Sequence, residues 1–230
     1  MKQSKEFSLK FFSNRAKLLL SEALVNHLST DASKDMNENN DQSWIWNFEL
    51  RTEDDKVLTL SYENHSGNQL HLLFLECLTR IASEKTILFL VKVNFREIEN
   101  YLRDENHLLA FPVEDFKVYE AEFKIIHNSL LISLLIRKLN TELNLDMASL
   151  FKNWVHLSLV VKNSQALLFV NALNKILLTN NSLQLIMAEN AALTIILNDF
   201  PMDISILQGV VDEIFRSHNQ DSSLKVVAVQ

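Results

Sequence analysis

The chain has 230 residues, of which 47% are hydrophobic, and it carries a formal net charge of -7. This apolar content can fill the core of one large or two small domains, which excludes disorder throughout the chain. Only 2 glycines and 2 prolines occur, which argues against the glycine-rich loops that hold phosphates in nucleotide-binding enzymes. Because the basic residues are scattered through an acidic chain, nucleic acid is not expected as a partner.

The N-terminus and the cysteine usage predict a cytoplasmic protein. Residues 1–6 are polar and lack the apolar core of a signal peptide. No run approaches the roughly 18 consecutive apolar residues of a membrane span, so no membrane partner is expected. The single cysteine, Cys77, lies in the apolar run Leu72–Leu78, and we interpret it as a buried small hydrophobe.

The first elements of the chain follow from hydrophobic spacing. Residues 6–29 carry apolar side chains three and four positions apart, which predicts an amphipathic helix, and the polar stretch 29–42 predicts a loop. Large apolar residues alternate in Trp44–Leu50, which is typical of a strand with one buried face. Residues 51–56 are then a hairpin connection to a second strand, Val57–Tyr62.

Two of the following segments remain ambiguous. Leu70–Leu75 is predicted as a third strand, although its apolar run is equally typical of the start of a helix. Thr86–Asn100 is predicted as a helix, although Ile87–Val93 alone is also typical of a buried strand.

The middle of the chain is predicted as a hairpin and a helix. Within His107–Ile126, a turn at Pro112–Asp115 separates two strands, and a helix at 128–142 follows. The later elements are predicted in this order: a strand at Trp154–Val161, a helix near 165–178, strands at 183–189 and 192–198, a helix at 203–217 capped by Asp203, and an edge strand at Leu224–Val229.

The sequence predicts an α+β fold in which antiparallel sheets pack with helices. Similar apolar blocks return after roughly 75 to 80 residues, so we predict a tandem degenerate repeat of a helix-strand-strand-helix unit, with domains at 1–145 and 146–230. The alternative is an α/β protein with a buried, mostly parallel sheet. Its strands would be Ile87–Val93, Ala166–Asn171 and Leu193–Asn198.

The side chains that usually carry chemistry are not grouped in the sequence. No two of the seven histidines share the i, i+4 spacing of a metal-binding helix, and no serine stands in a glycine-flanked elbow. The acidic cluster Glu53–Asp55 falls in a predicted hairpin connection, where charge is usually solvated. We therefore predict no enzyme activity, no metal and no cofactor.

Aromatic and aliphatic residues of the predicted first sheet are the best candidates for a binding surface. An apolar sheet face and an open edge strand can hold an extended segment of another protein. The predicted partner-binding residues are Trp44, Trp46, Phe48, Leu70, Leu72 and Phe74.

The element order across residues 6–142 resembles the class I type III secretion chaperones. The resemblance depends on Trp44–Leu50, Val57–Tyr62 and Leu70–Leu75 as an antiparallel triple, on the helix Ile87–Phe95, and on the hairpin Leu108–Ile126. It implies an acidic, cytosolic, non-enzymatic protein that dimerises and holds a segment of a secreted effector in extended form. The chain is longer than members of that family, and a partial second copy follows.

The resemblance also implies a dimer contact, because family members dimerise through the helix equivalent to Ile87–Phe95. For this chain the resemblance implies either a homodimer or an intramolecular pseudo-dimer with the second copy. The implied contact residues are Leu88, Phe89, Val91, Phe95, Leu168 and Phe169. Two other functions stay open at this point: a structural subunit of a larger assembly, and a degenerate nucleotide-binding-fold protein that lacks its phosphate loop.

Overall fold

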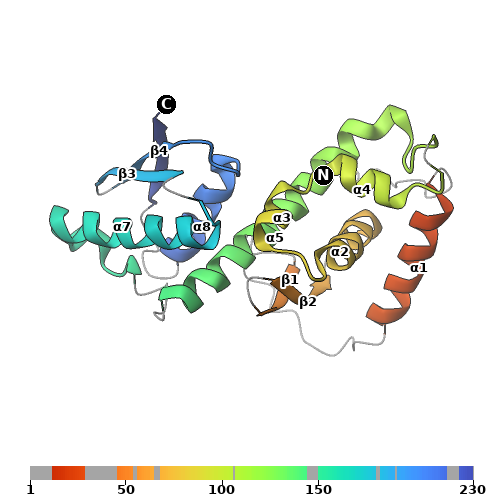
Figure 1. The fold of residues 1–230 in the computed structure, drawn as a ribbon, viewed down its shortest axis with the longest axis horizontal. Coiled ribbons are helices and arrows are strands. Elements are labelled where there is room, and N and C mark those ends of the chain that lie inside the picture. The colour runs from red at the N-terminus through yellow and green to blue at the C-terminus, as the bar shows by residue number, and fades with distance from the viewer. Residues whose placement is uncertain are drawn as a thin grey trace, which may run out of the picture. The chain divides into compact units, whose positions relative to one another are not determined.

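The structure is a computed structural model, and it describes residues 12–28, 46–53, 56–64, 68–105, 107–143, 150–179, 182–189, 191–216 and 223–229. The fold is mixed α+β, as predicted (Figure 1). Contacts divide the chain into two compact units. Unit 1 takes in the chain up to Thr86 together with Val93–Ser129, and unit 2 takes in Ile87–Lys92 and the chain from Leu130 onward. The predicted domains, 1–145 and 146–230, were drawn at a single boundary, whereas the two units each take part of one long helix.

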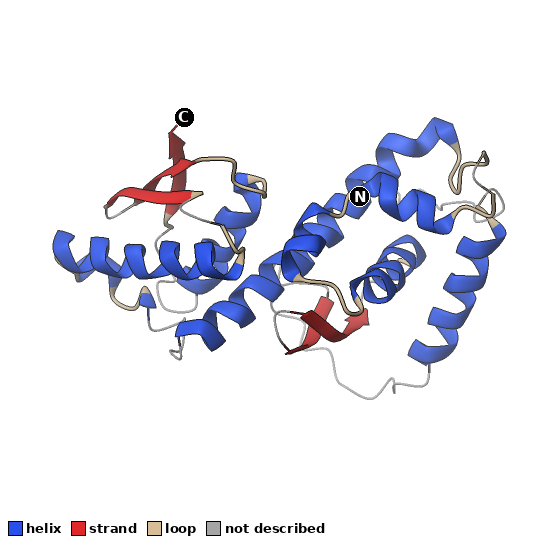
Figure 2. Ribbon diagram, in the orientation of Figure 1, coloured by secondary structure: helices blue, strands red, loops and turns tan. Residues whose placement is uncertain are grey.

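Unit 1 is built from helices and one hairpin (Figure 2). Strands β1 and β2 pair antiparallel, from Trp46 opposite Asn64 to Glu53 opposite Lys56, as the sequence predicted. The elements are α1 (Asn14–Leu28), β1 (Trp46–Glu53), β2 (Lys56–Asn64), α2 (Gln69–Ala82), α4 (Phe95–Leu102), the 3-10 turn η2 (Val113–Asp115) and the first half of α5 (Phe116–Leu143).

Unit 2 contains a three-stranded mixed sheet in the order β3-β4-β5. Strands β3 and β4 are antiparallel, whereas β4 and β5 are parallel and are connected through α8. The elements are α3 (Ile87–Lys92), the second half of α5, the 3-10 turn η3 (Trp154–His156), α7 (Leu159–Ile176), β3 (Leu183–Ala188), β4 (Ala192–Leu197), α8 (Ile204–Arg216) and β5 (Lys225–Val229).

Aromatic rings fill the core of unit 1. Phe95 lies at its centre, and its ring centroid is 4.8 Å from that of Phe116 and 6.0 Å from that of Phe74. Most of the rings meet edge to face, which is favourable for aromatic pairs beyond the area that they bury. The other members of the cluster are Phe12, Phe111, Tyr119 and Phe123.

Side-chain hydrogen bonds fix the start of α1 and the loop before α5. Both carboxylate oxygens of Asp104 accept hydrogen bonds from the first backbone N–H groups of α1, at Asn14 and Arg15, each at 2.7 Å. Glu99 is buried, and it accepts from Arg103 Nη2 at 2.6 Å and from the N–H of Ala110 at 2.8 Å. These bonds satisfy helix-terminal and buried polar groups that would otherwise cost stability.

Unit 2 has a smaller aromatic centre and a close helix contact. The Phe151 ring lies 5.1 Å from Trp154 and 5.7 Å from Phe169. Gly209 lets α8 approach α5 closely, because a Cβ atom at this position would overlap Cδ1 of Ile132. One of the two glycines of the chain is therefore used for close packing rather than for a turn.

The predicted hairpin at 107–126 is wrong. A turn with Pro112 at its start leads into α5, which continues through the predicted second strand and the predicted helix at 128–142. Tyr119, Phe123, Ile126 and Leu130 are all buried at spacings of four, three and four, which is the period of a helix face. The alternation of acidic and apolar residues in this stretch misled the prediction.

Two further strand predictions fail because a polar side chain caps a helix. Leu70–Leu75 lies in α2, and Asn68 Oδ1 accepts from the N–H of Leu70 at 3.0 Å at the start of that helix. Trp154–Val161 is not a strand, because Ser158 caps α7. The predicted helix at 86–100 is divided into α3 and α4, and the side chain of Asn94 caps the second of these.

The strands predicted at 183–189 and 192–198 are confirmed, and so is the edge strand near the C-terminus. The helix at 203–217 is also confirmed, and Asp203 Oδ1 accepts from the N–H of Ser205 at 2.9 Å. The tandem repeat is not confirmed, because residues 87–142 contain helices where 167–215 contain two strands. The parallel-sheet alternative is wrong, because Ile87–Val93 and Ala166–Asn171 fall on helices α3 and α7.

Candidate functional site

Of the six predicted partner-binding residues, the structure describes the side chains of three, and these three are buried. Trp44 lies outside the described residues, and of Trp46 and Phe48 it describes the β1 backbone but not the side chains. Leu70, Leu72 and Phe74 are buried in the core of unit 1. Leu70, Leu72 and Phe74 therefore do not form the predicted sheet surface.

The predicted contact residues are divided between the units. Phe95 belongs to the aromatic core of unit 1, whereas Leu88, Phe89 and Val91 lie on α3 in unit 2. On α7 the two neighbours differ in exposure, since Phe169 is 1% exposed and Leu168 is 48% exposed. The predicted dimer contact remains a prediction, and of the two α7 residues only Leu168 is accessible for it.

The best candidate surface is the outer face of the β3-β4-β5 sheet. Alternate residues of the strands, such as Leu193, Ile195 and Val226, are buried on the inner face, and β3 and β5 contact α7 and α8 respectively. The opposite residues are exposed or half-buried. We call this set the outer sheet face: Gln184, Ile186, Met187, Thr194, Ile196, Lys225, Val227 and Val229.

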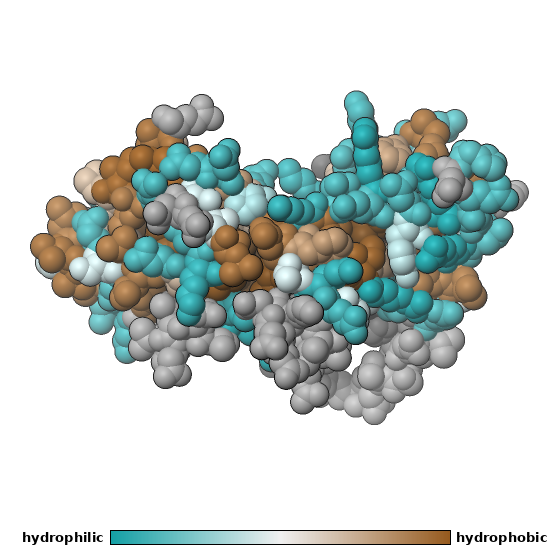
Figure 3. Space-filling view, in the orientation of Figure 1, coloured by the Kyte–Doolittle hydropathy of each residue, from teal (hydrophilic) through white to brown (hydrophobic). Residues whose placement is uncertain are grey.

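The strand register places these residues in rows. Met187, Thr194 and Val227 lie side by side across the three strands, and Gln184, Ile196 and Val229 form the next row. Lys225 is the only charged residue in the set. In Figure 3 brown side chains gather at the upper left, where Figure 1 shows the C-terminal strands. The outer sheet face is therefore a mainly apolar surface with one positive charge near its border.

Side-chain amides interrupt both edges of this sheet. At the β3 edge, Asn174 of α7 accepts from the N–H of Leu183 at 3.0 Å and donates to the carbonyl of the same residue at 2.7 Å. At the β5 edge, Gln208 of α8 accepts from the N–H of Val226 at 2.7 Å and donates to the carbonyl of Leu224 at 2.9 Å. Each amide makes the two bonds that a neighbouring strand would make.

A second apolar surface lies on α7. Its exposed side carries Val160, which is 76% exposed, together with Leu167 and Leu168. Val160 and Leu167 lie about two helical turns apart on the same side, Leu168 is next to Leu167, and α7 contains no acidic residue. We call Val160, Leu167 and Leu168 the α7 outer stripe. A helix that is apolar on its buried and exposed sides usually has a partner.

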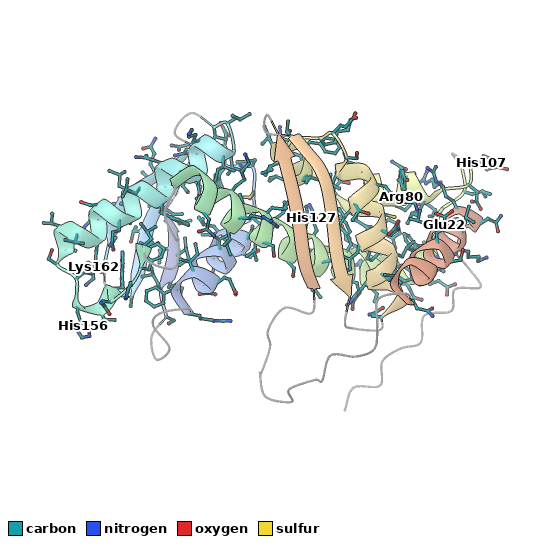
Figure 4. The ribbon with its side chains drawn as sticks, turned by 90° about the horizontal axis from the view of Figure 1, so that it is seen from below. Glu22, Arg80, His107, His127, His156 and Lys162 are labelled. Atoms are coloured by element: carbon teal, nitrogen blue, oxygen red, sulfur yellow. The ribbon has the colours of Figure 1, made fainter. Side chains whose placement is uncertain are left out.

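A hollow of about 490 Å³ lies near the N-terminus of α7. It is lined by Leu159, Lys162, Glu189, Ala191 and Ala192. The Lys162 side chain, labelled in Figure 4, is buried, and its Nζ donates to the carbonyl of Val155 at 3.4 Å. This hydrogen bond joins α7 to η3, so the buried ammonium group has a structural role.

The described titratable groups do not assemble a metal centre. His71 Nε2 and Glu122 Oε2 lie 2.6 Å apart and join α2 to α5. Burial raises the pKa of the Cys77 thiol far above its usual range, so this side chain stays protonated. Among the described residues, no group of three or more His, Cys, Asp or Glu side chains could hold a metal ion.

No helix in the described part of the chain combines the length and the apolar character needed to cross a membrane. Comparisons of the chain with protein-family models, curated proteins and solved structures found no match. Two of the elements on which the resemblance to type III secretion chaperones depends are not formed as predicted. The third strand lies in α2, and the second strand of the later hairpin lies in α5.

The sequence contained signals for the residues that its analysis missed. The edge strand predicted at Leu224–Val229 was one such signal, because a strand with one covered face turns alternate residues, here Lys225, Val227 and Val229, toward solvent. Asn174 stands among apolar residues on the buried side of α7. A polar side chain in such a position must find partners inside the fold.

Proposed function

We propose that this protein is a non-enzymatic, chaperone-like binding protein that holds a segment of a protein partner on the outer sheet face of unit 2. The observation that supports this most is the asymmetry of the sheet. Its inner face is buried, whereas Ile186, Met187, Val227 and Val229 expose apolar side chains on the other face. Exposed apolar patches of this kind commonly mark interaction sites.

The chemistry of the surface fits a protein partner better than a polyanion. A single lysine stands among the outer-face residues, in a chain with net charge -7. Binding to nucleic acid requires several basic side chains that neutralise phosphates. An apolar protein segment needs none.

The size of the surface indicates reversible binding. A face three strands wide and about five residues long covers roughly 240 Å². Burial of this area contributes about 6 kcal/mol before the entropic cost of association is subtracted. A surface of this size is suited to holding a segment and releasing it again.

The proposal can be tested with a photo-crosslinking amino acid at position 227 in the full-length chain, in native cytosol. Val118 in α5 is a matched control position, since it is 37% exposed and Val227 is 36% exposed. We expect a defined protein adduct from position 227 that the unmodified chain competes away, and none from position 118. Equal labelling from both positions would count against the proposal.

A second candidate function, a subunit of a larger assembly, is favoured by the α7 outer stripe. A second copy or another subunit that covers Leu167 and Leu168 would remove about half of each side chain from water. Replacing Leu168 with Glu keeps the core intact because this side chain points outward. Light scattering should show an oligomer that the variant dissociates. If the wild-type chain is a monomer at all concentrations, it does not form a homo-oligomer through the α7 outer stripe.

A further inference from the structure

We infer that the segment held on the outer sheet face is an amphipathic helix with an acidic residue beside Lys225, because side-chain amides from α7 and α8 already occupy both sheet edges. The inference rests on the proposed function and specifies the conformation of the bound segment. It also replaces the strand addition that the sequence suggested.

The β3 edge is closed at both ends. Asn174 makes both hydrogen bonds to Leu183, and the hydroxyl of Thr179 donates to the Asn174 Oδ1 atom at 3.1 Å, which holds the amide in place. At the other end, Asn163 Oδ1 accepts from the N–H of Ala188 at 3.0 Å. The register shifts between Leu185 and Met187, and such a bulge disturbs regular pairing along the rest of the edge.

The β5 edge is closed at its start. Gln208 satisfies the outward carbonyl of Leu224 and the outward N–H of Val226, and its Nε2 also donates to Asp212 Oδ1 at 2.8 Å. The amide stands where a peptide group of an added strand would have to lie, about 4.8 Å from the β5 backbone. Only the last residues of the strand are left for pairing, which is too short for a stable ladder.

The closed edges decide which conformation a bound segment can take. An extended segment laid on the face would bury backbone N–H and C=O groups with no strand beside them to pair with. A helix satisfies its own backbone groups and presents an apolar stripe. Helical segments that dock by an apolar face onto an apolar surface are a recurrent mode of recognition.

The charge of the outer sheet face favours a helix from another protein over a second copy of this chain. A carboxylate in the partner can pair with Lys225, the only charged residue of the outer sheet face. Among the described helices, α7 exposes the most large apolar side chains, and it contains two lysines and no acidic residue, so a second copy docked by α7 would bring no carboxylate to Lys225. The occupant is therefore a helix from another protein, with acidic residues flanking its apolar stripe.

Two fluorescent peptides of identical composition, made of Leu, Ala, Gln and Glu, test this with the full-length chain. One carries leucines at i, i+3, i+4 and i+7, and the other carries them at alternate positions. Fluorescence anisotropy should detect binding of the first peptide only. Val227→Asp should weaken this binding at least about tenfold, since a carboxylate on the face would lose its hydration, whereas Val118→Asp should leave it unchanged.

Three further variants keep the test independent of misfolding, which circular dichroism monitors. Val227→Thr preserves shape and strand preference and should weaken binding by a smaller factor. Lys225→Glu should weaken binding of the Glu-flanked helical peptide and strengthen that of a Lys-flanked one. Gln208→Leu should leave the affinity of the helical peptide within about twofold, while the opened β5 edge should bind the alternating peptide or another copy.

The outcomes separate the two proposals. Binding of the alternating peptide to the wild-type chain would overturn the helical inference and leave the proposed function standing. Binding of neither peptide, or of the helical peptide with equal affinity to Val227→Asp, would also overturn the inference. The proposed function would then be judged by the crosslink from position 227, which does not depend on the conformation of the bound segment.

Discussion

The two units treat their apolar side chains differently. In unit 1, aromatic rings from α2, α4 and α5 gather into one core around Phe95, and polar side chains such as Asp104 and Glu99 fix the connections. In unit 2, apolar residues also fill the core, but more large apolar side chains lie on the surface than in the described part of unit 1, among them Val160, Leu168 and Val227. The binding surface proposed above lies on unit 2.

The difference follows from the geometry of the two architectures. Helices that pack around a shared centre can each turn one apolar stripe inward. A three-stranded sheet covered by helices on one face turns every second side chain toward solvent. When those side chains are Ile, Met and Val, as in unit 2, the sheet keeps an apolar face that the described residues of its own unit leave exposed.

The largest effect should come from removing a central ring of unit 1. Phe74→Ala should lower the free energy of unfolding by about 3 to 5 kcal/mol, because the fully buried ring contacts Phe95, Phe111 and Phe123. Denaturant titration measures the change. Cys77 lies on the same helix and is the only thiol of the chain, so its reaction with a thiol reagent reports the opening of unit 1.

Phe169→Ala in unit 2 is the matched control, since this ring is equally buried. We expect a similar loss of stability but a smaller increase in the reactivity of Cys77. Burial keeps the native thiol protonated and protected. Equal reactivity of Cys77 in both variants would show that the two units unfold together. The units would then differ in their exposed surfaces but not in their stability.

A smaller effect should come from the contact between α5 and α8 in unit 2. Gly209→Ala should destabilise by about 1 to 2 kcal/mol, because the new methyl group would overlap Ile132 and the gain in helix propensity only partly compensates. Ile132→Val removes the overlapping atom, and alone it should cost about 1 kcal/mol. The double variant should be more stable than the sum of the two changes predicts. If the effects of the two changes on stability simply add, α5 and α8 move apart to accommodate the new methyl group, and the overlap with Ile132 is not what destabilises the variant.

A stabilising change should come from the end of α7. Leu178, the residue after the C-cap Leu177 of α7, lies in the left-handed region at φ 52°, and the N–H groups of Leu178 and Thr179 donate to the carbonyls of Lys175 and Asn174. Glycine normally takes this position. Leu178→Gly should therefore raise the free energy of unfolding by about 0.5 to 1 kcal/mol, since the backbone strain exceeds the entropic cost of glycine.

Thermal unfolding followed by circular dichroism is the measurement for this variant, and Leu178→Ala is its control. Alanine removes the same exposed side chain but keeps the Cβ atom that makes a positive φ unfavourable. It should have little effect. Equal stabilisation by both variants would show that the gain comes from removing an exposed leucine side chain and not from relieving backbone strain.

The smallest effect should come from the surface of unit 1. Arg80 on α2 and Glu22 on α1 lie next to each other, with Nη2 and Oε2 2.7 Å apart (Figure 4). Both side chains are partly exposed, so Glu22→Gln should cost no more than about 0.5 kcal/mol, and less at high salt. A loss above 1 kcal/mol in a urea titration would show that the link between these helices is stronger than its exposure suggests.

Some elements were predictable because their pattern is local. The apolar blocks of β3, β4 and β5 and the cap at Asp203 identified the C-terminal strands and α8 correctly. The hairpin predicted at 107–126 failed because Glu and Lys residues on the solvent side of α5 imitate a strand alternation. The period of three and four from Tyr119 to Leu130 is visible only when the segment is considered at its full length.

The sequence by itself determined an acidic α+β chain with enough apolar residues for a large core, a single cysteine and few glycines. These properties depend on composition and on contacts between near neighbours. Only the tertiary structure decided that Leu70, Leu72 and Phe74 are buried, that Leu168 is exposed beside the buried Phe169, and that amides close the edges of the C-terminal sheet. The physical reason is that burial and edge pairing depend on residues distant in the sequence, as Gln208 and Val226 are.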